Sequence, residues 1–300
     1  MFSRISTILI VSIMLIALVG GVLQATADTE ANKALVRRFN DEAFNKGNLD
    51  VIDEMFPDNF VSHGSGSSTI TGPEVHKQGN IALRTAFPDL HMTVDDLIAE
   101  GDMVVNRWTA IGTHEDEYMG IPPTGVHATV TGISIDRIAD GMFREGWVIQ
   151  DALGMLQQLG VMDAMGREDY AWAEPSDVTG DPGNPEENKA FVTRYLDALS
   201  GKDKPPATVD EYVADSDEAL KQHIAMFEAA FPRYELIADF MIAEADKVVV
   251  RATFRGTHQG DMIGIPPTGR DVTAMGNIIY RIAAGADYID VNIGTGVGSR

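Results

Sequence analysis

Apolar residues follow a helical spacing at the start of the folded chain and alternate with polar residues further along it. Residues 33–44, 48–55 and 73–86 carry apolar stripes or helix-start signals, and each is predicted to form a helix. Alternation over four later runs predicts strands. These runs are His91–Ala99, Met103–His114, Ala128–Ile138 and Phe143–Asp151. Helices followed by an antiparallel meander are typical of an α+β fold, in which a curved sheet wraps over the helices.

The second half of the chain repeats the first. The hexapeptide Gly120–Gly125 returns letter for letter as Gly264–Gly269, 144 residues later, and Ala86-Phe87-Pro88 returns as Ala230-Phe231-Pro232 at the same offset. A chance repeat of this kind has odds on the order of one in a thousand, which indicates an internal duplication. The copy lacks the residues that correspond to a loop rich in Ser and Gly, Ser62–Gly72.

The length of the chain fits this duplication. A chain of 300 residues is long for one compact domain and suits two of about 130. We therefore expect one domain over residues 28–166 and a second over residues 188–300. Residues 167–187 between them are dominated by Glu, Asp, Pro and Gly and have no apolar periodicity, which predicts a linker.

The first 27 residues are predicted to lie outside the fold. Arg4 is their only charge, Ile8–Leu23 is an almost unbroken apolar run, and Ala25-Thr26-Ala27 matches the small-residue cleavage pattern. This is typical of a secretory signal cut before Asp28, and an uncleaved membrane anchor is the alternative. We expect the folded part to be secreted or periplasmic, with no membrane attachment after cleavage.

The net charge, the lack of cysteine and the spacing of the histidines exclude several classes of binding partner and site. The formal net charge of −22 argues against nucleic acid and anionic membrane surfaces. A chain without cysteine has no disulfide and no thiol chemistry. Two His and one Asp form a known iron-binding triad, but no tight ligand spacing such as H-x-x-x-H occurs, so we expect no metal site.

Side chains of the last predicted strand in the first half alternate between two faces, so Glu145, Trp147, Ile149 and Asp151 share one of them. Two carboxylates beside an indole and an aliphatic side chain are unusual for plain core. They suit the wall of a mostly apolar pocket that holds a few polar groups.

Several motifs occur in order across this region. They are Gly112-Thr113-His114, the Gly120–Gly125 hexapeptide, Trp147 four residues before Asp151, and Gln158-Leu159-Gly160. In this order they resemble the SnoaL-like polyketide cyclases, or ester cyclases, of the NTF2-like superfamily. The resemblance implies a cone-shaped α+β barrel and, with the repeat, two tandem barrels of which the second is degenerate. It also implies chemistry without a cofactor on a small apolar carbonyl compound.

Asp151 is the residue expected to carry this chemistry. In the family that the chain resembles, the Asp at this place is the acid/base for enolisation in an intramolecular aldol closure. At a strand end that faces an apolar pocket, desolvation would raise the pKa of Asp151 and suit it to proton transfer. The alternative is that Asp151 caps the helix that starts near Ala152, and the two roles are compatible.

Further candidates surround this carboxylate. His63 and His114 could orient a carbonyl group or share a proton. The alternative for His63 is a surface position, and for His114 a structural role, because the second half repeats it. Arg107 could bind a carboxylate or an enolate, or pair with Glu145 inside the barrel. Glu145 and Trp147 are expected in the substrate-binding wall.

The copy is degraded where this chemistry would lie. The constant offset pairs Asp151 with Thr295, Trp147 with Val291 and Glu145 with Ile289.

Two functions stay open. One is an exported enzyme of proton transfer that cyclises, isomerises or hydrates a small apolar carbonyl compound. The other is a non-catalytic module that holds a hydrophobic ligand in the same conical pocket.

The duplication also predicts how the halves assemble. A sheet face too apolar for water needs a partner, so we expect an intramolecular pseudo-dimer that is monomeric in solution. The predicted contact face consists of Val104, Asn106, Trp108 and Ala110 in the first half and Val248, Val250, Ala252 and Phe254 in the second.

Overall fold

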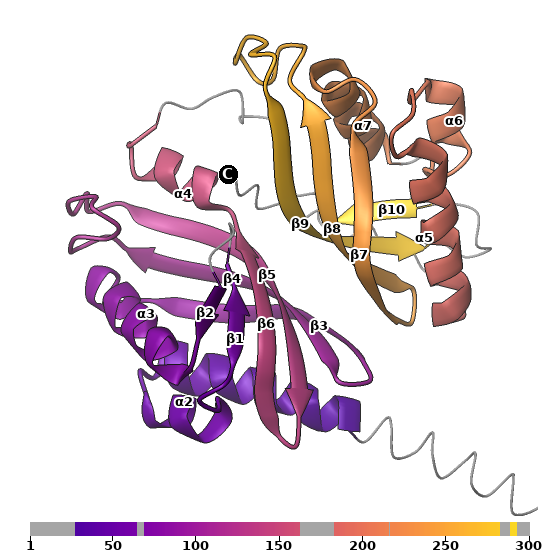
Figure 1. Cartoon of the computed structure of the whole chain (residues 1–300). Helices are drawn as coiled ribbons and strands as arrows, with labels where there is room; N and C mark the ends of the chain where they lie inside the picture. Colours follow the sequence, from indigo (N-terminus) through magenta and orange to yellow (C-terminus); the bar gives the residue numbers. More distant parts are fainter. Residues whose placement is uncertain (1–27, 65–68, 163–182, 216, 283–288, 293–300) are drawn as a thin grey trace, which may run out of the picture.

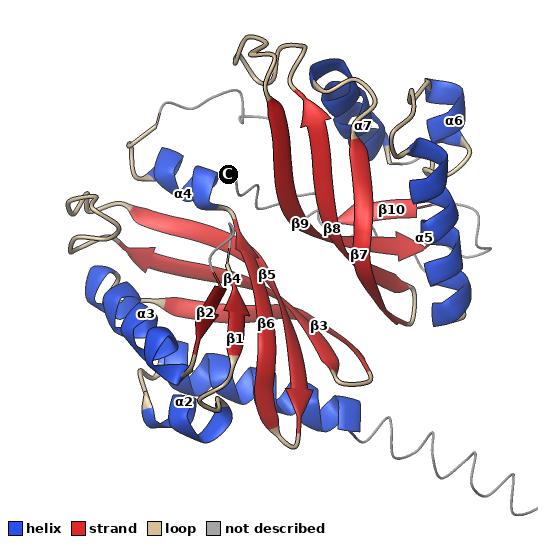
Figure 2. Ribbon diagram, viewed as in Figure 1, coloured by secondary structure: helices blue, strands red, loops and turns tan. Residues whose placement is uncertain are grey.

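The computed structural model describes residues 28–64, 69–162, 183–215, 217–282 and 289–292 (Figure 1). The predicted signal segment, most of the predicted linker and Thr295 lie outside the described residues. Figure 2 shows two sheets that face one another, with helices on their far sides. In the described part of the chain, no helix is long and apolar enough to cross a membrane.

Helices of the first half cover one face of the first sheet. Residues 28–39 form a helix that continues as the π-helical η1 (Asn40–Asn45), and α2 (Asp50–Met55) and α3 (Pro73–Ala86) follow. The apolar stripes predicted from the sequence are largely the buried positions of the first two helices. α3 has proline at its first turn, where no backbone hydrogen bond is lost. The three predicted helices are thus confirmed.

The first sheet has six strands in the order β2-β1-β6-β5-β4-β3. They are β1 (Val61–His63), β2 (Thr69–Thr71), β3 (His91–Glu100), β4 (Met103–Thr113), β5 (His127–Ala139) and β6 (Met142–Gln150), and α4 (Ala152–Gln158) follows. β1 runs parallel to β6, and β3 to β6 form the predicted antiparallel meander. The prediction of a plain loop over Ser62–Gly72 is wrong at both ends, because β1 and β2 pair there and cover the edge of β6.

The second half repeats this architecture. Its elements are α5 (Pro185–Leu199), α6 (Pro206–Asp210), α7 (Glu218–Ala230), β7 (Glu235–Glu244), β8 (Lys247–Thr257), β9 (Asp271–Ile282) and β10 (Ile289–Asn292). The described strands pair in the order β10-β9-β8-β7. Even the irregular register between Val94 and Asp96 recurs between Ala238 and Phe240. The fold is therefore α+β, with two tandem copies of one unit.

The repeat is displaced by one residue in the last described strand. In the first half Arg137 pairs with Glu145, whereas in the second half Arg281 pairs with Asp290. The chain between the paired residues is one residue longer in the second half. The mapping at constant offset is therefore wrong here, and the counterpart of Glu145 is an acid. The corrected counterparts are Asp290 rather than Ile289 for Glu145, and Asn292 rather than Val291 for Trp147.

One apolar face of each sheet contacts the other sheet. The buried residues of this contact are Ile98, Val105, Ile133 and Ile135 from the first sheet and Ile242, Val249 and Ile279 from the second. The predicted contact face is wrong, because Val248, Val250 and Ala252 pack on the helices of their own half, and Trp108 lines a cavity in the first half. Both faces of each sheet are buried, so alternation alone does not show which one meets the helices.

Two matching sets of polar contacts join the halves. Lys33 Nζ lies 2.5 Å from Glu244 Oε1, and Glu244 Oε2 accepts a hydrogen bond from the backbone N–H of Ala99 at 2.8 Å. Lys189 Nζ likewise lies 2.6 Å from Glu100 Oε1, and Glu100 Oε2 accepts from a backbone N–H of β7 at 2.8 Å. Because the second set repeats the first in sequence, the contact has approximate twofold symmetry.

One ion pair breaks this symmetry. Lys247 Nζ lies 2.6 Å from Asp96 Oδ2, and both side chains are half-buried. The repeat positions of these residues are Met103 and Phe240, which pack on the apolar contact. A charged contact on one side of the pseudo-twofold axis is therefore an apolar contact on the other.

Candidate functional site

A cavity of about 180 Å³ lies between the helices and the inner face of the first sheet. Aromatic and aliphatic side chains from the first helix, α3 and β4 to β6 form most of its wall. Its polar lining residues are Asn40, His76, Asn106, Tyr118, Ser134, Asp136 and Gln150. A mostly apolar cavity with a few polar groups is the usual form of a small-molecule site.

Asp136 brings a carboxyl group from β5 into this cavity. A methyl group built on Gly146 would lie 3.0 Å from Asp136 Oδ1 and 3.2 Å from the ring of Phe60, so the carboxyl group is closely surrounded. Among the described residues it has no hydrogen-bond or ion-pair partner. Burial raises the pKa of Asp136 from 3.8 to about 7. Near neutral pH the group can therefore either take up or release a proton.

Two further polar groups are buried in the cavity wall. The ring of His76 packs on Phe56 and Phe60 at centroid distances of 4.8 and 5.0 Å, and burial lowers its pKa to about 4. Neither His76 Nε2 nor Asn106 Oδ1 has a hydrogen-bond partner in the described structure. Buried polar atoms without partners destabilise the fold unless a ligand or water satisfies them, so these atoms point to a ligand.

A hydroxyl group stands beside the carboxyl group on the same strand. Trp108 Nε1 donates to Ser134 Oγ at 3.0 Å, which leaves the Ser134 proton able to bind a ligand. Ser134 and Asp136 lie two positions apart on one face of β5, which corresponds to about 7 Å along a strand. One small molecule can therefore contact both side chains.

Gly132→Ala should destabilise the protein by about 1–3 kcal/mol, because the new methyl group forces the Trp108 ring out of its packed position. A Cβ at Gly132 would lie only 2.2 Å from that ring. Gly276→Ala is the matched control at the repeat position, where a Cβ meets nothing within 4 Å, and it should change stability by less than about 0.5 kcal/mol. Urea unfolding of both variants checks the difference, and equal losses would contradict the proposed packing.

Glu145 and Trp147 lie on the sheet face opposite the cavity, so the prediction that they form its wall is wrong. They do share a face, as alternation predicted, but this face is turned toward the second half, where the rings of Trp147 and Phe240 are 5.1 Å apart. His63 belongs to the same group. Its ring stacks on Trp147 at 5.3 Å, and its Nε2 lies 3.0 Å from Glu145 Oε1.

Arg107 is also absent from the cavity lining. On β4 it pairs with Ile133, whose side chain packs between the sheets, so it lies on the face turned away from the cavity. The predicted pairing of Arg107 with Glu145 is wrong. Arg137 takes this place instead, with its Nη1 at 3.4 Å from Glu145 Oε2.

Asp151 acts as the N-cap of α4. Its Oδ1 accepts a hydrogen bond from the backbone N–H of Gly154 at 2.9 Å. The capping role that the sequence left open is thus confirmed. Asp151 is not among the residues that line the cavity, whereas its neighbour Gln150 is. The acid/base role of Asp151 stays a prediction from the sequence.

His114 holds the hexapeptide turn. It is fully buried, its Nδ1 shares a hydrogen bond with Thr124 Oγ1 at 3.2 Å, and its ring stacks on Phe87 at 5.1 Å. The second half repeats this arrangement, with His258 Nδ1 at 3.1 Å from Thr268 Oγ1. Identical geometry in both halves favours the structural role over catalysis.

The sequence prediction missed Asp136, His76 and Asn106. A signal for two of them is present in the strands, because Asn106 and Asp136 each directly follow a buried aliphatic residue in mid-strand. Polar side chains at such positions face a cavity or need partners. His76 carries no comparable signal, because a histidine on an amphipathic helix is usually a surface residue.

The model of the SnoaL-like polyketide cyclase family matches residues 34–159 and 195–286. Among curated relatives, the aklanonic acid methyl ester cyclases DnrD of Streptomyces peucetius and DauD of Streptomyces sp. strain C5 are each 30% identical to this chain over 129 residues. The matched region is 42% of this chain, 88% of DnrD and 80% of DauD.

Two solved structures are similar to a comparable share of the chain. IdmH of Streptomyces antibioticus is 33% identical, covers 43% of this chain and 98% of its own, and has a TM-score of 0.40. A proposed SnoaL-like cyclase from Jannaschia sp. CCS1 is 26% identical, covers 45% of this chain and 94% of its own, and has a TM-score of 0.42. The family model matches both halves and more than half of the chain, so this protein belongs to the SnoaL-like polyketide cyclase family.

Proposed function

We propose that the first half is a cyclase- or isomerase-type enzyme that uses Asp136 as its acid/base on a small apolar carbonyl compound. The observation that carries this proposal is a carboxyl group in a mostly apolar cavity, with no partner among the described residues and a pKa raised to about 7. Membership of a family of polyketide cyclases that bind small hydrophobic substrates supports the same class of reaction.

The first step is proton removal next to a carbonyl group. The substrate lies along β5, so that its acidic C–H is close to Asp136 and its carbonyl oxygen close to Ser134. Asp136 takes the proton, and the Ser134 hydroxyl donates a hydrogen bond to the enolate oxygen. The Trp108 Nε1 donor at 3.0 Å fixes the direction of this hydroxyl. The enolate forms inside the apolar wall, where water does not return the proton.

Ring closure returns the proton. The enolate carbon attacks a second carbonyl group of the same molecule, which forms one C–C bond and turns that carbonyl oxygen into an alkoxide. The protonated Asp136 then gives its proton to the alkoxide. The product is an isomer of the substrate, and neither an oxidant nor a reductant is consumed. His76, which is neutral at pH 7 because its pKa is about 4, and Asn106 are placed to hydrogen-bond the polar groups of the ligand.

Enolisation can be tested without knowledge of the natural substrate. Deuterium exchange into the apolar ketone β-tetralone in D₂O, followed by NMR, should be faster with the full chain than with buffer. The rate should rise about tenfold per pH unit up to about pH 7 and stay level above it, because only the ionised form of Asp136 accepts a proton. Exchange that equals the buffer background at every pH would count against the enzyme.

The assembly of the two halves is part of this proposal. We infer that they form an intramolecular pseudo-dimer that is monomeric in solution, and the apolar contact between the sheets and the paired Lys–Glu contacts support this. Export through residues 1–27 stays a prediction from the sequence, which the N-terminal residue of the mature protein would test.

A further inference from the structure

The second half holds a cavity of its own, between α7 and its sheet, with a volume of about 230 Å³. It therefore has at least the size of the cavity in the first half. Its wall is again mostly aromatic and aliphatic. A copy that served only to cover the first sheet would gain stability if large side chains filled this space, because an empty cavity costs stability in proportion to its volume.

The polar groups of the first cavity have been replaced in the second. The repeat positions of His76, Asn106, Ser134 and Asp136 hold Leu220, Val250, Ile278 and Tyr280. The position of Asp136 thus holds a tyrosine here, and no carboxylate is among the lining residues in the described part of the chain. The second cavity has lost the carboxyl group while it has kept its space. His223 also lines it, and burial lowers the pKa of this histidine to about 4, so it is neutral near pH 7.

The open volume of the second cavity results from one further substitution between the two copies. In the first half the Trp108 ring lies against Gly132, but in the second half the repeat positions hold Ala252 and Gly276. A Cβ at Gly276 would meet nothing within 4 Å, although Gly276 lines the cavity. The loss of the indole therefore leaves open volume, which no side chain of the described residues fills.

Three tyrosine side chains and His223 supply the polar part of the wall. The rings of Tyr195 and Tyr280 meet edge to face at a centroid distance of 5.7 Å, and their hydroxyl groups interact. A hydrogen bond between two phenols uses one of their two protons, so the other is able to bind a ligand. Burial raises the pKa of both tyrosines far above the physiological range, so both remain protonated donors. A protonated donor in an apolar wall suits a neutral acceptor such as a carbonyl oxygen.

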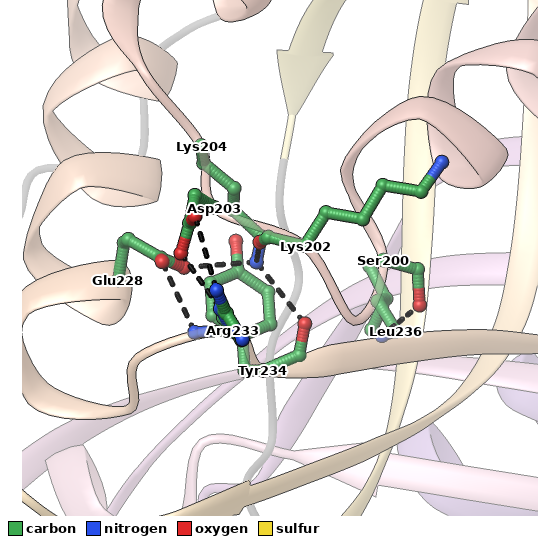
Figure 3. A network of polar contacts seen from close by, with 8 residues as sticks. All are labelled: Ser200, Lys202, Asp203, Lys204, Glu228, Arg233, Tyr234 and Leu236. Carbon is green, nitrogen blue, oxygen red and sulfur yellow. Dashed lines mark hydrogen bonds and ion pairs between the residues drawn. The ribbon is translucent and has the colours of Figure 1, made fainter.

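A third tyrosine of the wall, Tyr234, is fixed by a buried lysine that lies over its ring. Lys204 Nζ lies 3.7 Å from the centre of its ring and donates to Glu228 Oε2 at 2.9 Å and to the backbone carbonyl of Tyr234 at 3.1 Å (Figure 3). Glu228 also accepts from the backbone N–H of Arg233 at 3.0 Å. Lys204 is itself buried, so this network fixes the ring at the cavity wall rather than at a mobile surface.

We propose that the second half is a separate binding site for an apolar small molecule that carries a carbonyl oxygen, and that it binds this molecule without turning it over. The ligand fills the space beside Gly276 and accepts a hydrogen bond from the Tyr195–Tyr280 pair. This site is independent of the proposed function of the first half, because it shares no lining residue with the first cavity.

The test is a titration of the full chain with the fluorescent aryl ketone Prodan. The wild type should bind two molecules per chain, and Gly276→Leu, which fills the second cavity, should bind one. Val148→Phe fills the first cavity at a position outside the second, and it should also bind one. Two molecules bound by the Gly276→Leu variant, or one molecule bound by the wild type and none by Val148→Phe, would overturn the proposal.

A second variant keeps the test independent of cavity filling. Tyr195→Phe combined with Tyr280→Phe removes both hydroxyl groups and almost no side-chain volume, so the double variant should still fold. Prodan affinity at the second site should fall about tenfold, which corresponds to the loss of one buried hydrogen bond. Unchanged affinity would exclude the tyrosine pair as the donor. Binding is read without turnover, so failure here and failure of the enolisation assay are separate results.

Discussion

Asp136→Asn should lower the rate of β-tetralone exchange by about 10²- to 10⁴-fold, the usual contribution of a positioned general base. Asparagine has almost the same shape as aspartate, so the cavity keeps its form, but the amide neither accepts the proton nor returns it. Asp151→Asn is the matched control. Asparagine caps a helix about as well as aspartate, so α4 stays capped and the rate should remain within about a factor of two.

The same Asp136→Asn protein should be more stable than the wild type at pH 8. The pKa of Asp136 is 3.8 unfolded and about 7 folded, so the unfolded chain ionises first as the pH rises. The carboxyl group therefore favours the folded state fully below pH 3.8, and this contribution is lost as the pH rises through about 7. Asparagine does not ionise, and we expect a gain of about 2 kcal/mol at pH 8 in urea unfolding.

Two results would contradict this assignment. Full exchange activity in Asp136→Asn with loss in Asp151→Asn would return the chemistry to Asp151, as the sequence first suggested. The second result is a difference in unfolding free energy between the wild type and Asp136→Asn that is the same at pH 3.5 and pH 8. It would show that the Asp136 carboxyl group titrates normally, in an environment that is wetter than the cavity indicates.

Residues 28–166 expressed without the second half should self-associate or aggregate. Removal of the second half uncovers the apolar face formed by Val105, Ile133, Ile135 and Trp147, and such a face is rarely left in water. Ultracentrifugation of the fragment should show dimers or larger species at concentrations where the full chain is a monomer. We expect its unfolding midpoint to fall as well, because Glu244 no longer accepts from Lys33 and Ala99.

A fragment with Val105→Thr and Ile135→Thr is the control for this experiment. Threonine keeps the strand propensity and makes the exposed face polar, so the altered fragment should be monomeric. If the unaltered fragment is already a monomer with the stability of the full chain, the two halves are independent domains, and the contact between the sheets does not hold them together.

The order and type of the elements could be predicted from the sequence because helix and strand periods differ. The three first-half helices, the four-stranded meander and the duplication all follow from spacing alone. Which face of the meander meets the helices could not be predicted. Ile133 and Ile135 point to the other sheet and Trp108 to the cavity, and both sets are apolar because both faces are covered.

This ambiguity of faces explains the error at the site. Glu145 and Trp147 looked like pocket residues because a carboxylate and an indole share a face, but that face is the one that meets the second half. Asp136 follows the buried Ile135 in mid-strand, and a carboxylate at such a position indicates either a cavity or a buried partner without deciding between them. The capping role of Asp151 follows from local rules, because Asp is a favoured N-cap residue.

The one-sided ion pair shows what fusion of the two copies has made possible. In a homodimer every substitution changes two contacts at once, whereas here each side of the axis has changed alone. Two first halves would set Asp96 against Met103, and two second halves would set Lys247 against Phe240, so either self-pairing would leave a charge without its partner. The linker keeps the correct partner at a high effective concentration. Pairing of like halves from neighbouring molecules is therefore disfavoured twice, once by the tether and once by charge.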